Sequence, residues 1–166
     1  MILLHPYAQK LRNGLSNPKT YPYWPQLIAL LDGEEPIIQV GVEEEEGLPL
    51  VEDFRRGMRL KAIESLLREC KYWIAVDSFL PHLAHHLPKP GVVLWGPSDP
   101  EIFGYPENLN LLKGREWLRK DQFAIWELQS PQPEAFLGPR EVARQITDWW
   151  TTQPRSTVTY LHRSAQ

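Results

Sequence analysis

The sequence lacks several features that would assign it at once to a broad class of protein. Its one cysteine, Cys70, among 166 residues excludes an internal disulfide framework and a cysteine-cluster zinc site. No run approaches the roughly 18 apolar residues that a membrane helix needs, so we expect no membrane span or membrane partner. Residues 1–6 are too short and uncharged a stretch for a signal peptide, which makes a cytoplasmic protein the expectation.

Common enzyme motifs are missing as well. No strand is followed by Gly-x-Gly-x-x-Gly, which disfavours a dinucleotide oxidoreductase, and the P-loop pattern of ATPases is absent. No Gly-x-Ser-x-Gly is present, which disfavours a Ser-His-Asp hydrolase. The net charge of −3 argues against broad affinity for nucleic acid. The composition, 42% hydrophobic and 23% charged, is that of a folded domain, with an unusual number of prolines (16) and tryptophans (7).

Apolar runs that alternate with amphipathic stretches predict the fold. Runs with the length of buried strands occur at residues 2–4, 36–41, 72–76 and 91–95, with weaker strand signals at 110–112 and 123–126. Apolar residues at helical spacing occur at 24–31, 60–70, 80–87 and 138–150. We therefore predict an α/β protein with a single Rossmann-like parallel sheet and helices on both faces. One domain would cover residues 1–152, followed by a polar tail over 153–166.

The loops at the carboxyl ends of the strands are the candidate ligand site of such a sheet. They comprise residues 7–23, 41–46, 77–82 and 96–104. The third loop is the most specific, because a strand runs directly into a helix whose first N–H groups lack partners and attract phosphate. Ser78 is the candidate side-chain cap of that helix. A well-capped structural helix explains this segment equally well.

Several motifs share their order and spacing with one enzyme family. They are Lys19-Thr20-Tyr21-Pro22, Gln39-Val40-Gly41 before four glutamates, Met58-Arg59-Leu60, Asp77-Ser78 with His82-Leu83-Ala84, and Gly96-Pro97-Ser98-Asp99-Pro100. Together they resemble the donor-binding signature of glycosyltransferase family 9, the ADP-heptose–type transferases. The resemblance spans most of residues 1–115 and implies one half of a two-domain GT-B fold. It also implies a nucleotide or nucleotide-sugar ligand, with an ADP-sugar donor favoured and no cofactor besides that donor.

The resemblance further implies roles for individual residues. Asp77 is the candidate catalytic residue at the sugar. The candidates for binding the donor and its diphosphate are Lys19, Ser78, Phe79, Leu80 and His82. The candidates for binding the ribose and the base are Glu45, Glu44 and Met58. As residues alone, Lys19 and the glutamates are also typical of solvated loops, and Met58 and His82 of ordinary packing. No residues have metal-ligand spacing, so we expect a metal-independent site.

Two departures from the family pattern leave the function open. Phe79 replaces the family's glycine, and its ring would either displace a diphosphate or stack on a ligand. The family's amino-terminal domain, which carries the catalytic base, has no counterpart in the chain. The sequence predicts a compact glycosyltransferase, or the donor-binding half of one, completed by a homodimer mate, by a separate acceptor-domain protein or by the long loop over residues 7–23. The alternative is a non-catalytic module that binds or sequesters a nucleotide or nucleotide sugar.

The tryptophans suggest where such a homodimer would form. The candidate contact surface lies near Trp117, Trp126, Trp149 and Trp150. Trp149 and Trp150 fit burial within the domain equally well.

Overall fold

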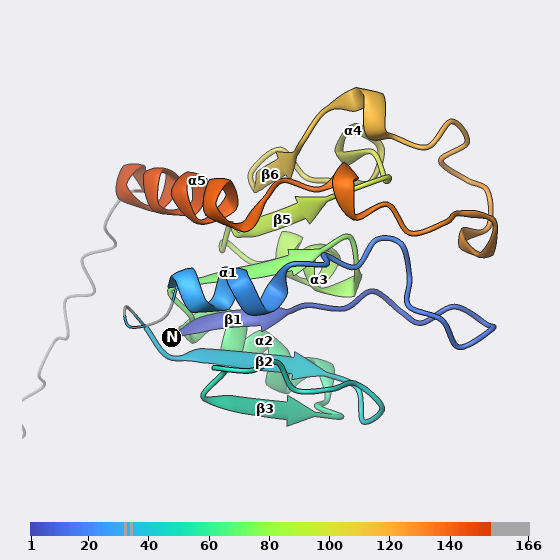
Figure 1. Ribbon diagram of the computed structural model, residues 1–166. Coiled ribbons are helices and arrows are strands. Elements are labelled where there is room, and N and C mark those ends of the chain that lie inside the picture. Colours follow the sequence, from blue (N-terminus) through green and yellow to red (C-terminus); the bar gives the residue numbers. More distant parts are fainter. Residues whose placement is uncertain (32, 34, 154–166) are drawn as a thin grey trace, which may run out of the picture.

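Six parallel strands form one sheet in the computed structural model, which describes residues 1–31, 33 and 35–153 (Figure 1). The strands are β1 (Ile2–His5), β2 (Ile37–Gly41), β3 (Asp53–Arg56), β4 (Tyr72–Val76), β5 (Val92–Trp95) and β6 (Leu109–Leu112). Their order, β3-β2-β1-β4-β5-β6, is that of a doubly wound sheet, in which the chain reverses its direction of travel between β1 and β4. The predicted fold class is confirmed.

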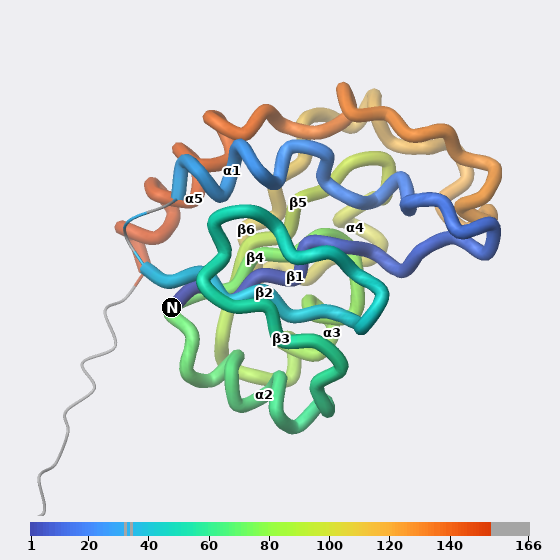
Figure 2. The backbone as a smooth tube through the Cα atoms, turned by 60° about the horizontal axis from the view of Figure 1, so that its bottom comes forward, coloured from blue at the N-terminus to red at the C-terminus, as the bar shows by residue number. Residues whose placement is uncertain are grey.

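Helices cover both faces of the sheet, as Figure 2 shows. One face carries α1 (Trp24–Leu31) and α5 (Pro139–Thr152), and the other carries α2 (Leu60–Glu69) and α3 (Phe79–His85). Successive strand residues point to opposite faces, so Ile2 and Leu4 pack under α1 and α5 while Leu3 packs under α2 and α3. Burial on both faces explains why the strands are apolar along their whole length.

Most of the tryptophans fill these two cores. Trp24, Trp73 and Trp95 are no more than 2% exposed. Trp149 and Trp150 of α5 pack on Tyr72 of β4, with ring centroids 6.0 and 5.1 Å away. Trp149 and Trp150, which the sequence analysis included in a candidate dimer surface, therefore pack at least partly within the domain. The homodimer stays a prediction.

Three local predictions were wrong or incomplete. β3 was not predicted, because three of its four residues are charged. Residues 123–126 form no strand; they make a turn that leads into the 3₁₀ helix η2 (Trp126–Leu128). The predicted loop 96–104 contains a short helix, α4 (Pro100–Phe103), capped by the Asp99 side chain. Beyond Gln153, the predicted polar tail lies outside the described residues.

Two long segments, 6–23 and 113–137, lie side by side beyond the carboxyl ends of the strands (Figures 1 and 2). The Arg12 N–H donates to the Glu127 carboxylate at 3.1 Å. The Tyr21 hydroxyl donates to the Leu137 carbonyl at 3.0 Å, and the buried Tyr21 ring also packs edge-on against Phe136. The same edge of the sheet therefore carries both segments and the predicted ligand loops. Across the described part of the chain, every helix is too short or too polar to span a membrane.

Candidate functional site

The point where the strand order reverses brings together two charged residues from distant loops. Lys19 lies in the segment after β1, and Asp77 directly follows β4. Lys19 Nζ is 3.2 Å from Asp77 Oδ2, and the two side chains are only 18% and 10% exposed. Salt screens a partly buried pair of this kind less than an exposed one. The structure thus joins the residues that the sequence assigned to the diphosphate and to the sugar.

A second contact between β1 and the β4 loop lies beside this ion pair. His5, the last residue of β1, has its Nδ1 3.0 Å from the Ser78 hydroxyl oxygen. His5 is almost fully buried, and loss of hydration lowers its pKa to about 4, so the ring is neutral at pH 7. The Phe79 ring packs edge-on against His5, with 4.6 Å between ring centroids. These contacts fix the turn that leads into α3.

The first turn of α3 presents main-chain N–H groups that its N-cap residue, Ser78, does not cap with its side chain. Ser78 occupies the cap position with an extended backbone, but its hydroxyl makes no cap hydrogen bond because it faces His5. The prediction that Ser78 caps the helix through its side chain is therefore wrong. Phe79 is 39% exposed, whereas the Leu80 side chain is fully buried, so Leu80 can reach a ligand only through its N–H.

A cleft of about 170 Å³ separates the loop after β1 from the acidic loop after β2. It is lined by Tyr7, Ala8, Lys10, Ser16, Thr20, Glu44, Glu45 and Glu46. Glu45 Oε2 accepts a hydrogen bond from the Val42 N–H at 3.1 Å. Burial raises the pKa of Glu45, and this effect outweighs the opposing hydrogen bond. Both predicted ribose-binding glutamates thus line one cleft.

Glycine at position 41 is what lets the Glu45 carboxylate fold over the end of β2. A Cβ atom at Gly41 would lie 1.9 Å from Glu45 Oε2 and 3.2 Å from the Phe54 ring. Any larger residue would therefore displace the Glu45 carboxylate from the Val42 N–H. This requirement explains the Gly in the Gln39-Val40-Gly41 motif.

Two of the predicted site residues lie apart from the ion pair. Met58 is half-buried between β3 and α2 and packs against the core under α2 and α3. His82, on α3, has its Nδ1 2.8 Å from the Tyr105 hydroxyl, and the two rings pack edge-on. Their roles at the base and the diphosphate stay predictions, because Met58 packs against the core here and the exposed His82 contacts Tyr105.

Two residues were not predicted to lie near Lys19: the sequence placed Trp126 at a candidate dimer surface and gave Arg119 no role. Trp126, in segment 113–137, lies with its ring centroid 5.4 Å from Lys19 Nζ. Arg119 stacks on the same ring, with its Cζ 3.8 Å from the centroid. Each cation gains an attraction to the electron-rich face of the indole. More than one hundred residues separate Trp126 from Lys19, and no local pattern signals such a contact.

The assembled site has the chemistry of an anion-binding cleft with hydroxyl-binding carboxylates. Lys19 and the first N–H groups of α3 favour negative charge, and the Asp77 and Glu45 carboxylates accept hydrogen bonds from hydroxyl groups. Among residues 1–31, 33 and 35–153, no group of three or more His, Cys, Asp or Glu side chains is placed to hold a metal ion.

Comparisons with known proteins relate part of the chain to one enzyme family. Residues 56–122 match the family model "Glycosyltransferase family 9 (heptosyltransferase)". Lipopolysaccharide heptosyltransferase 1 of Escherichia coli strain K12 is 31% identical over 109 residues, which cover 59% of this chain and 34% of the relative. The matched region therefore spans about a third of the length of that curated relative.

Solved heptosyltransferase structures share the fold over most of the chain. E. coli heptosyltransferase WaaC, determined with ADP, gives a TM-score of 0.62 at 20% identity and covers 89% of this chain and 43% of its own. E. coli ADP-heptose lps heptosyltransferase II gives a TM-score of 0.63 at 19% identity, over 91% of this chain and 46% of its own. The sheet described above is thus the fold of one part of these larger chains.

Proposed function

Because the chain carries a heptosyltransferase-like domain of the glycosyltransferase family 9 type, we propose that it binds an ADP-sugar and takes part in glycosyl transfer without a metal ion. The diphosphate would lie where β1 and β4 diverge, on Lys19 and the first N–H groups of α3. The ribose would lie in the cleft of Glu44 and Glu45. The presence of ADP in the WaaC structure supports the choice of nucleotide.

The observation that carries the proposal is the Lys19–Asp77 ion pair at the point of strand reversal. Doubly wound sheets bind their ligands at this point. A lysine ammonium and the positive end of a helix both stabilise phosphate oxygens. Thr20, the neighbour of Lys19 in the chain, lines the cleft that would accommodate a ribose, so one extended ligand could contact all of these groups.

In the transfer step, an acceptor hydroxyl would attack the anomeric carbon of the donor sugar while the bond from that carbon to the diphosphate oxygen breaks. Negative charge then develops on the departing ADP, and Lys19 would stabilise it where a metal ion does so in other enzymes. Once phosphate engages Lys19, the Asp77 carboxylate would be released to accept hydrogen bonds from sugar hydroxyls. The proton of the acceptor would pass to a base that we do not assign to a described residue.

Calorimetric titration with ADP, together with an assay of ADP release from ADP-heptose, tests this proposal. We expect Lys19→Ala to weaken ADP binding about tenfold, the value of one charged hydrogen bond. Asp77→Ala should abolish the release of ADP from ADP-heptose, while the circular dichroism spectrum shows that the fold is intact. Lys61→Ala, at an exposed lysine of α2, is the matched control and should change neither quantity. Full binding and turnover in a Lys19→Ala and Asp77→Ala double variant would rule out this site.

The alternative function is a non-catalytic module that binds or sequesters the nucleotide or nucleotide sugar. Phe79 favours it, because its ring stands beside the proposed diphosphate position, where the family has glycine. In this case ADP would bind tightly, yet the protein would neither hydrolyse an ADP-sugar nor transfer its glycosyl group to any acceptor. The same titration and release assay therefore separate the two functions.

A further inference from the structure

Arg119 is a charged residue whose side chain the proposed function does not use. Its guanidinium stacks on the Trp126 ring, with 3.8 Å from Cζ to the ring centroid, and one terminal N–H donates to the Ala124 carbonyl. Its main-chain N–H donates to the Pro97 carbonyl at 3.0 Å. The main-chain bond holds segment 113–137 against the loop after β5, and any residue but proline could make it.

The side chain has hydrogen-bonding capacity that the protein leaves unused. Arg119 Nε is buried and has no hydrogen-bond partner among the described residues. No carboxylate within residues 1–31, 33 and 35–153 forms an ion pair with Arg119, and Asp121 acts on it only through its charge, without a salt bridge. Burial lowers the pKa of the guanidinium, and the negative charge of Asp121 only partly opposes this effect. A partly buried cation in this state is costly unless an anion neutralises it.

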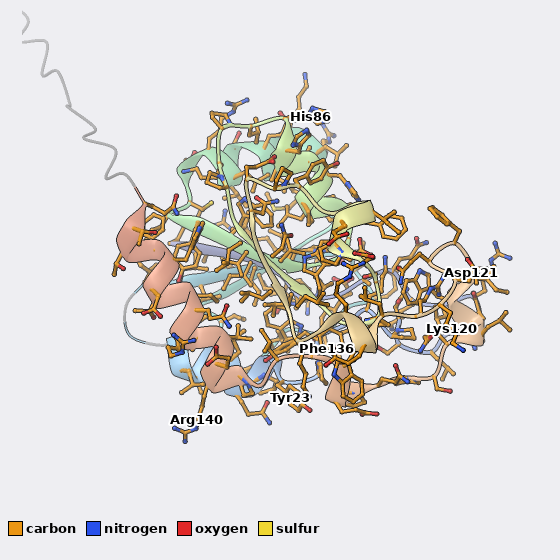
Figure 3. The ribbon with its side chains drawn as sticks, turned by 90° about the horizontal axis from the view of Figure 1, so that it is seen from above. Tyr23, His86, Lys120, Asp121, Phe136 and Arg140 are labelled. Carbon is orange, nitrogen blue, oxygen red and sulfur yellow. The ribbon has the colours of Figure 1, made fainter. Side chains whose placement is uncertain are left out.

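A cleft opens beside this guanidinium. It has a volume of about 150 Å³, and its polar lining consists of Arg119, Lys120, Asp121 and Gln129. Figure 3 shows Lys120 and Asp121 at the end of the molecule opposite α5, on the side to which segment 113–137 extends. The space exceeds the roughly 30 Å³ that one water molecule occupies, so it can hold a phosphate or carboxylate group.

The cleft is close to the site already described. Lys19 and Arg119 contact the same indole, at 5.4 and 3.8 Å from its centroid. Their charges therefore lie within about 10 Å of one another, the distance over which salt at 0.1 M leaves charges coupled. The charge of Arg119 would attract an anionic ligand bound on Lys19, and a second anion bound on Arg119 would lie next to that ligand.

We propose that Arg119 is an anion-binding residue and that its cleft accepts a phosphate or carboxylate group. Apart from the N–H that donates to the Ala124 carbonyl, the planar guanidinium has terminal N–H donors in a fixed geometry that match two oxygen atoms of such a group, which lysine cannot do. Two ligands could supply the group: the diphosphate of the donor or an acidic group on the acceptor. Only this choice of ligands rests on the proposed function; the anion site itself rests on the contacts of Arg119.

Titrations of the full chain with pyrophosphate, ADP and inorganic phosphate test the proposal and separate the two sources. If Arg119 binds the donor diphosphate, Arg119→Gln weakens the binding of pyrophosphate and of ADP about tenfold or more. If Arg119 serves an acceptor, Arg119→Gln leaves the affinity for ADP unchanged. Inorganic phosphate then binds the wild type about tenfold more tightly than it binds Arg119→Gln, both in the absence of ADP and with saturating ADP. Lys61→Gln removes the same charge from an exposed residue of α2, outside the cleft, and should alter these affinities by less than about twofold.

Equal affinities for all three anions in the wild type and in Arg119→Gln would overturn the proposal. Should Arg119→Gln fail to fold, Arg119→Lys decides, because it keeps the charge and removes the paired N–H donors; wild-type affinity in that variant would also overturn it. If the wild type binds no ADP at all, the proposed function fails, while the inorganic phosphate titration still tests Arg119.

Discussion

His5 shows how burial alters the chemistry of a single residue in this protein. A histidine beside a proposed phosphate site would ordinarily be taken for a cationic ligand. Here its pKa of about 4 keeps it neutral, and its contacts are with Ser78 and the Phe79 ring. We therefore interpret His5 as the residue that holds the turn between β4 and α3, not as one that attracts phosphate.

The lowered pKa of His5 predicts how stability depends on pH. The unfolded chain takes up a proton at His5 near pH 6.5, whereas the folded protein does so only near pH 4. Between these values the unfolded state binds more protons, so the free energy of unfolding falls as the pH falls, by about 3 kcal/mol in total. Urea denaturation from about pH 7 to about pH 5 measures the upper part of this window.

The control for this prediction is His5→Gln, which can still bond Ser78 but does not titrate. Its free energy of unfolding should change little over the same interval. Glu141, whose pKa is lowered to about 2, contributes only at lower pH, below the ordinary carboxyl pKa of 4.5. Parallel pH profiles for the wild type and His5→Gln would show that His5 does not govern this interval.

Some site residues could be predicted from the sequence and others could not, for a physical reason. Lys19 and Asp77 belong to short motifs with recognisable neighbours, and the prediction that both serve one site fits their ion pair. Arg119 and Trp126 follow the last strand; the sequence placed Trp126 only in a weak strand signal and at a candidate dimer surface, and no local pattern placed either residue near Lys19. The contact of Trp126 with Lys19 depends on how two long segments pack, which the order of residues does not reveal.

At the scale of elements, strand β5 depends on a glycine at its start. A Cβ atom at Gly91 would lie 2.2 Å from the ring of Trp73, which is fully buried and donates its indole N–H to the Lys89 carbonyl. The indole of a neighbouring strand thus occupies the space that a side chain would need. The close approach of β4 and β5 therefore requires glycine at this position.

We predict that Gly91→Ala lowers the free energy of unfolding by about 1 to 3 kcal/mol, because the Trp73 ring cannot move aside in a packed core. Urea or thermal denaturation measures the change. Gly138→Ala is the matched control, because a Cβ atom at Gly138 would meet no other atom within 4 Å and the backbone φ there is −66°. Its expected change is at most about 0.5 kcal/mol. Similar losses in both variants would contradict the packing argument.

The elements that the sequence predicted well are those with two buried faces or a clear apolar stripe. β4 is apolar at every position, and the apolar residues of α2 recur at helical spacing, so both were evident. β3, with Asp53, Arg55 and Arg56, is an edge strand whose charges hide its pairing with β2. Charged edges of this kind discourage pairing with other chains. Residues 123–126 have a strand-like composition but no neighbouring strand to pair with.

For the whole molecule, ligand binding and folding stability are linked. A nucleotide that binds only the folded state at a hundred times its Kd adds about 2.7 kcal/mol to the free energy of unfolding. For a chain of 166 residues this corresponds to a rise of about 5 to 10 °C in Tm. We predict this rise with ADP, because its diphosphate can engage Lys19 and the start of α3 together.

AMP is the matched ligand for this thermal experiment, since it keeps the base and ribose but has one phosphate fewer. Its effect on Tm at the same concentration should be clearly smaller. If AMP and ADP raise Tm equally, the second phosphate makes no contact of its own, and the proposed position of the diphosphate would be wrong.

The Lys19–Asp77 ion pair has a consequence for the choice of ligand. Any anion that approaches Lys19 competes with the Asp77 carboxylate already in place. The free energy gained on binding is therefore the difference between the attraction of the lysine for the anion and its attraction for the aspartate. A monovalent anion such as chloride or acetate offers no more charge than the aspartate does and gains almost nothing by the exchange. Only a multivalent group such as a pyrophosphate exceeds it, which makes the pair a filter against the abundant small anions of any salt solution.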